Sequence, residues 1–123
     1  MFLDTTDFPR VRVCPAHSES EWESQFDALF ARAQRFVLLG VMSHAQGDAP
    51  QGERKRLVLW LKRNRLALAQ WCAGAVIVQT SRALALASKA MAPALTKAFG
   101  IPVRIVEREA DVDTEIARLL GRP

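Results

Sequence analysis

Tyrosine is absent from this chain of 123 residues, and only two cysteines and two histidines are present. The lack of tyrosine removes one common acid–base group from any catalytic mechanism. Cys14 and Cys72 lack the paired spacing of a disulfide scaffold, and two lone thiols are typical of a reducing cytoplasm. His17 and His44 fall in expected loops without further ligands at suitable spacing, so we expect no metal and no other cofactor.

Longer signals are missing as well. No apolar run approaches the ~18–20 residues of a membrane span, and the first seven residues carry two acids and no basic group, unlike a secretory signal. Neither a nucleophile elbow of the form Gly-x-Ser-x-Gly nor a glycine-rich phosphate loop occurs. We therefore expect a soluble, cytoplasmic protein with no membrane contact and no catalytic centre of these types.

The residues that are present favour one compact domain. Half of the chain is hydrophobic and 24% is charged, an ordinary balance for a globular protein. A length of 123 residues is that of a single domain. We therefore treat residues 1–123 as one domain.

Hydrophobic periodicity predicts the elements of that domain. Strands are expected at residues 2–4, 10–14, 36–41, 73–79 and 101–106, with 36–41 and 73–79 at the centre of the sheet. Helices are expected from a capping box at Ser18 and Glu21, over 51–71, after Thr80 or Ser81, and over 111–120. Pro93 is expected to kink or split the third helix, and Gly100 to end it. The alternation predicts an α/β fold: a mixed, mostly parallel sheet of four or five strands flanked by four helices.

This element order resembles the STAS fold of the sporulation anti-sigma-factor antagonists. The segment Asp7-Phe8-Pro9-Arg10-Val11-Arg12-Val13 before an acidic helix, together with Leu59-Trp60-Leu61-Lys62 and Thr80-Ser81, is also similar to small uncharacterised bacterial proteins placed near that fold. The resemblance implies protein–protein binding and, in some members, phosphorylation of a loop serine. Only Ser43 stands at the corresponding position, without the aspartate and glycine of the family's turn. An ordinary polar loop serine is the alternative interpretation.

Charge is unevenly distributed along the chain. The first helix is acidic, whereas the stretch 53–65 has one acid against six basic residues: Arg54, Lys55, Arg56, Lys62, Arg63 and Arg65. On a helical wheel Leu57, Val58, Leu61, Leu68 and Cys72 form the expected inward stripe of the second helix, flanked by Trp60, Ala67 and Trp71. Leu59 and Leu66 fall on the opposite face, among Lys55, Lys62 and Arg63. They are either scattered exposed apolar residues or part of a contact surface.

Three functions are compatible with these features. The lead hypothesis is a non-enzymatic STAS-like interaction or regulatory module whose α-helical faces bind a protein partner or form a weak homodimer through Leu59 and Leu66. The first alternative is a small-molecule-binding or enzymatic domain that uses Ser43, His44 and Asp48 in the crevice near the 42–52 loop. The second is nucleic-acid binding through the basic helix over 54–65, for which a solvated helix face is the simpler interpretation.

Overall fold

The computed structural model describes residues 2–14, 21–42 and 51–121. Five strands form one sheet in the order β1-β2-β3-β4-β5. Their bounds are β1 (Phe2–Asp4), β2 (Arg10–Cys14), β3 (Phe36–Met42), β4 (Cys72–Gln79) and β5 (Val103–Val106). β1 is antiparallel to β2, and the other neighbouring strands are parallel. The predicted mixed, mostly parallel sheet is confirmed, with the apolar strands β3 and β4 in its interior.

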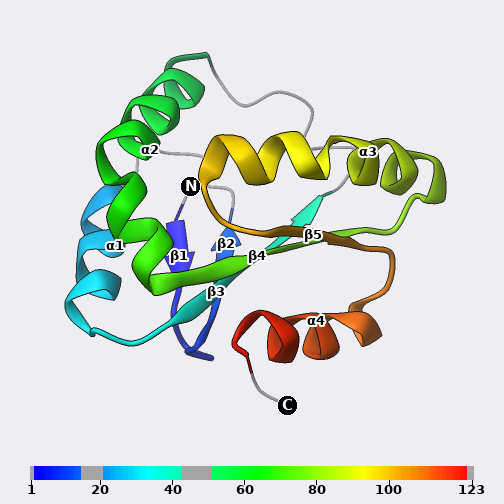
Figure 1. Cartoon of the computed structure of the whole chain (residues 1–123), viewed down its shortest axis with the longest axis horizontal. Helices are drawn as coiled ribbons and strands as arrows, with labels where there is room; N and C mark the ends of the chain where they lie inside the picture. Colours follow the sequence, from blue (N-terminus) through cyan, green and yellow to red (C-terminus); the bar gives the residue numbers. More distant parts are fainter. Residues whose placement is uncertain (1, 15–20, 43–50, 122–123) are drawn as a thin grey trace.

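The described part of the chain contains four α-helices. They are α1 (Trp22–Ala31), α2 (Gln51–Trp71), α3 (Arg82–Phe99) and α4 (Val112–Leu119), the last preceded by a single 3₁₀ turn at Glu109–Asp111. From β2 to β5 each crossover steps to the next strand in the same direction, so right-handed connections place α1, α2 and α3 on one face of the sheet. α4 follows the last strand and covers the other face (Figure 1).

Each face of the sheet has its own hydrophobic core. Beneath α1 and α2, an aromatic cluster surrounds Trp60, whose ring centroid lies 4.4 Å from that of Phe26 and 5.5 Å from that of Trp22. The core beneath α4 is aliphatic and comprises Val37, Leu39, Ala73, Val76, Val78, Val106, Val112 and Ile116. β3 contributes to both cores, as expected for a strand covered on both faces.

The expected inward stripe of α2 is wrong in three places, one of which is Cys72, since this residue begins β4 and does not belong to the helix. Trp60 is 3% exposed and lies in the core, whereas Val58 is 50% exposed. The helix departs from helical geometry at Asn64 (φ −112°, ψ 16°), where the side-chain amide donates to the Trp60 carbonyl at 3.0 Å. The buried and half-buried residues Leu57, Trp60, Leu61, Leu68 and Trp71 nevertheless fall on one stripe at 100° per residue, so the centre of the expected stripe was misplaced towards Val58.

Pro93 was expected to kink or split α3, and the split is wrong. The helix continues from Arg82 through Pro93 to Phe99, and Gly100 ends it in the left-handed conformation (φ 75°) as predicted. Pro93 has no amide hydrogen to donate to the Lys89 carbonyl four residues earlier. The chain therefore tolerates one missing helical hydrogen bond on the side of α3 that faces β5.

β4 begins with an irregularity that positions β5. Phe36 pairs with Cys72 and Val37 with Gly74, so Ala73 is left without a partner. A Cβ on Gly74 would lie 2.8 Å from a Leu119 methyl and 2.9 Å from the Pro102 carbonyl oxygen. The next residue, Ala75, donates its amide to that same carbonyl at 2.8 Å. Glycine thus permits the close approach of β4 to the residue that precedes β5.

Candidate functional site

The predicted loop site cannot be assigned a geometry. Ser43, at the position of the phosphorylated serine that the STAS resemblance implies, and its neighbours His44 and Asp48 lie outside the described residues. Among the residues that are described, no three His, Cys, Asp or Glu side chains group so as to hold a metal ion. Cys14 and Cys72 are both unpaired, and burial raises the pKa of the Cys72 thiol to about 12. Cys72 is therefore a protonated core residue and no nucleophile at neutral pH.

The outer face of α2 carries the residues predicted as an interface. Leu59 is 50% exposed and Leu66 is 86% exposed, while Lys55, Lys62 and Arg63 around them are exposed as well. The opposite side of the helix is held to the core by Trp60 and Leu68. The two leucines are therefore free to contact a partner without any change in the core.

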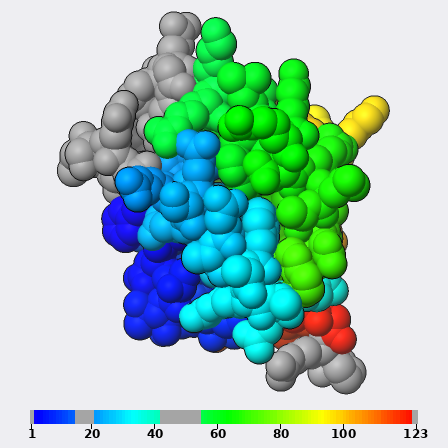
Figure 2. All heavy atoms as spheres, turned by 90° about the vertical axis from the view of Figure 1, so that its left-hand side faces the viewer, coloured from blue at the N-terminus to red at the C-terminus, as the bar shows by residue number. Residues whose placement is uncertain are grey.

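The acidic and basic helices meet within the same molecule. Glu23 on α1 accepts from Arg56 at 2.5 Å and lies 3.8 Å from Arg63, both on α2. Arg56 also lies over the Trp22 ring, 5.4 Å from its centroid. Figure 2 shows α1 and α2 side by side on one face of the molecule. We expected the two helices to present opposite charges to a partner, but part of that charge is neutralised between them.

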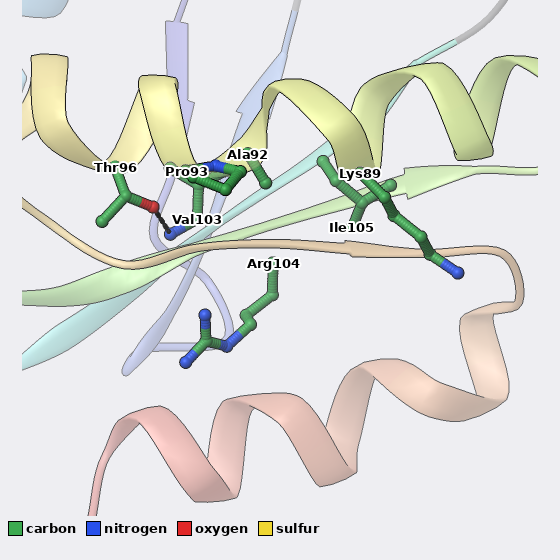
Figure 3. Close-up of a pocket in the computed structure, with 7 residues that line it drawn as sticks. All are labelled: Lys89, Ala92, Pro93, Thr96, Val103, Arg104 and Ile105. Carbon is green, nitrogen blue, oxygen red and sulfur yellow. Dashed lines mark hydrogen bonds between the residues drawn. The ribbon is translucent and has the colours of Figure 1, made fainter.

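The structure also contains a hollow that the sequence did not indicate. It has a volume of about 570 Å³ and lies between α3 and the outer edge of β5 (Figure 3). Its lining residues are Lys89, Ala92, Pro93, Thr96, Val103, Arg104 and Ile105. A second hollow of about 540 Å³ lies on the other side of the same edge, against α4. No local sequence pattern could have found them, because both depend on the position of β5 in the sheet.

The hollows are shallow features of the surface and hold no convergent catalytic group. Thr96 Oγ1 accepts a hydrogen bond from the Val103 amide at 3.0 Å, so its hydroxyl is engaged in the fold. Lys89 forms an ion pair with Glu107 at 3.5 Å, and Arg104 lies 3.9 Å from Glu115. Both cations are therefore paired within the fold.

No protein-family model, curated protein or solved structure matches this chain. In the part of the chain that the structure describes, no helix is long and apolar enough to cross a membrane.

Proposed function

We propose that this chain is a non-enzymatic, STAS-like protein-interaction module that contacts its partner through the outer face of α2. The observation that carries the proposal is the exposure of Leu66, 86% on a helix whose other side is packed into the core. The chain also has the strand and helix order on which the resemblance to STAS domains rests. Two unpaired cysteines support a reducing compartment such as the cytoplasm.

The proposed partner on this face is a second copy of the chain, in a weak homodimer. Leu59 and Leu66 are seven residues apart and lie two helical turns from each other on one side of α2. Pairing two such helices buries four leucines, but it also brings Lys55 and Lys62 of both copies together. Because like charges repel, the dimer should be weak at low ionic strength and stronger when salt screens the lysines.

Sedimentation equilibrium tests this proposal. Burying one exposed leucine contributes on the order of 1–2 kcal/mol, and Leu66 counts twice in a symmetric pair. Leu66→Ser should therefore weaken the dimer by on the order of 30-fold or more. The matched control is Leu86→Ser, because Leu86 is a 60% exposed leucine on α3. The proposal fails if the wild-type protein is monomeric up to about 1 mM in both low and high salt, or if both variants weaken the dimer equally.

A further inference from the structure

The α3 helix lacks the polar outer side of an ordinary surface helix. It lies on the face of the sheet opposite to α4, at the β5 side (Figure 1), and its inner side includes the fully buried Ala85. The outer side of such a helix is normally polar, because water covers it. Instead Leu84, Leu86 and Met91 are 41%, 60% and 59% exposed. An apolar outer side of this kind indicates a contact surface.

The exposed apolar residues of α3 form one continuous strip. On a wheel of about 100° per residue, the middle of the strip is an arc of about 60° that holds four exposed alanines, Ala83, Ala87, Ala90 and Ala94. Leu84 and Met91 lie on one flank of these alanines, and Leu86 lies on the other. The strip is roughly 17 Å long at 1.5 Å per residue. No charged side chain interrupts it.

The charges of α3 have one sign and lie along one flank of the strip. The helix carries three cations, Arg82, Lys89 and Lys97, and no acidic residue. On the same wheel the three cations fall within an arc of about 80° that includes Leu86. Lys89 is paired with Glu107 at 3.5 Å, whereas neither Arg82 nor Lys97 forms an ion pair in the part of the chain that the structure describes. One unpaired cation therefore lies near each end of the strip.

A further cation adjoins the C-terminal end of α3. Arg65 on α2 is exposed, and its guanidinium donates to the carbonyls of Lys97 and Ala98 at 2.9 and 3.3 Å. Backbone carbonyls carry no net charge, so they leave the positive charge of Arg65 uncompensated. The surroundings of the strip are therefore complementary to an anionic surface.

We propose that the outer side of α3 binds the surface of an anionic phospholipid membrane, with the helix lying in the plane of the interface. Leu84, Leu86 and Met91 enter the boundary between headgroups and acyl chains. Arg82 and Lys97 reach the lipid phosphates from the flank, because long basic side chains extend their charge away from the apolar surface that their stems cover. Apolar area and attraction to anionic lipids together set the strength of such binding.

This mode of binding needs no membrane-spanning segment. The expectation of no membrane contact rested on the lack of a long apolar run and of a secretory signal, and a helix that lies in the interface requires neither. The α3 strip is separate from the outer face of α2, so this proposal and the proposed homodimer can hold independently.

Other occupants fit the strip less well. A second copy of the chain offers no acidic residue on α3 to pair with Arg82 and Lys97. The centres of protein–protein interfaces are rich in tryptophan, tyrosine and arginine, whereas the centre of this strip is alanine. A nucleic acid would pair with the cations through its phosphates but would leave the apolar strip uncovered.

Co-sedimentation with sucrose-loaded vesicles tests the proposal. The protein should bind vesicles of phosphatidylglycerol and phosphatidylcholine, and it should bind phosphatidylcholine vesicles at least about tenfold more weakly, because each basic residue near an anionic surface contributes roughly fivefold. Leu86→Ser should weaken binding to the anionic vesicles roughly tenfold, because a mostly exposed leucine no longer enters the lipid. Leu66→Ser on α2 removes a more exposed leucine and should change this binding less than about twofold.

A charge variant tests the cationic flank without changing the apolar strip. Lys97→Gln should weaken binding to the anionic vesicles about fivefold. Lys62→Gln removes the same charge from the outer face of α2 and should have a clearly smaller effect, since attraction to the membrane falls off within a Debye length. Equal effects of the two variants would show that only the net charge of the protein matters, which would overturn the proposal.

Fluorescence quenching by brominated phospholipids identifies the side chains that enter the lipid. The tryptophan introduced by Met91→Trp should be quenched in anionic vesicles, whereas the one introduced by Leu66→Trp should not. Trp22 and Trp60 are buried, so they should contribute a constant background. Equal quenching of the two introduced side chains would overturn the proposal.

Two further results would also overturn it. One is the absence of binding to anionic vesicles up to about 5 mM lipid, and the other is an equal loss of binding in Leu86→Ser and Leu66→Ser. Weaker self-association of Leu86→Ser in the absence of lipid would instead assign the strip to a second copy. Saturable binding of a DNA oligomer that depends on Lys97 and not on Leu86, without vesicle binding, would assign the cations to nucleic acid.

Discussion

The Gln25 side chain should contribute measurably to stability, because Gln25 Oε1 accepts a hydrogen bond from the Leu3 amide at 2.8 Å and Gln25 Nε2 donates one to the Leu3 carbonyl at 3.0 Å, which closes the outer edge of β1. Replacing it with methionine keeps the length and the helix propensity of the residue but removes both hydrogen bonds. A typical intramolecular hydrogen bond has a net contribution of about 1 kcal/mol. Gln25→Met should therefore lower the free energy of unfolding by about 2 kcal/mol. For a domain of this size, that corresponds to a decrease in Tm of about 6–10 °C.

Urea denaturation followed by circular dichroism measures this change, and hydrogen exchange localises it. The Leu3 amide should exchange faster in Gln25→Met, whereas amides at the centre of β3 should respond only to the global loss of stability. Gln70→Met is the matched control, since Gln70 is exposed on α2. If the two variants differ by less than about 0.5 kcal/mol in the free energy of unfolding, Gln25 does not stabilise the β1 edge and this reasoning is refuted.

Three further changes test other parts of the fold. Trp60→Ala should lower the free energy of unfolding, measured by urea denaturation, by about 3–5 kcal/mol, because a large buried aromatic side chain is removed. A loss below about 1 kcal/mol would contradict the core position of Trp60. Gly74→Ala should cost at least 1–3 kcal/mol in the same assay, because the new methyl meets the Pro102 carbonyl, and an unchanged Tm would show that β5 can move away. The folded-state pKa of Cys72, about 12, lies above its ordinary value of 9.0, so the unfolded chain loses this proton first. Cys72 should therefore leave the free energy of unfolding unchanged below about pH 9 and lower it by roughly 1.4 kcal/mol per pH unit above that pH. The variant Cys72→Ala should lack this part of the decline. Identical pH profiles of unfolding free energy for the two proteins would contradict the prediction.

The sequence predicted most of the fold because its strands and helices carry clear periodicity. The bounds of β1 and β2 were predicted to the residue, and helix α2 was expected over the range in which it occurs. Its packing was harder to predict, because the apolar residues Val58 and Trp60 lie at opposite sides of the inward stripe and periodicity alone does not fix the centre of that stripe. The inward position of Trp60 depends on its packing against Trp22 and Phe26 of α1, which is a contact between elements far apart in the sequence.

The surfaces were predicted less completely than the elements. Exposure of Leu59 and Leu66 followed from the helical wheel, but the ion pairs of Glu23 with Arg56 and Arg63 depend on α1 and α2 being neighbours. The hollows beside β5 depend on strand order, which periodicity does not encode. No local pattern could identify Val103 and Ile105 as edge residues, because a strand's position in the sheet is a property of the whole topology.

The Gln25 contact with Leu3 also limits how large an assembly this sheet can form. A sheet with two open edges can grow by repeated addition of strands and lead to filaments, since each added copy exposes a new edge. Here the β1 edge is closed within the molecule by the Gln25 side chain, so copies of this chain do not join head to tail through it. Edge-to-edge association of sheets should therefore stop at a pair of copies, and loss of the Gln25 side chain would remove this barrier to open-ended polymerisation.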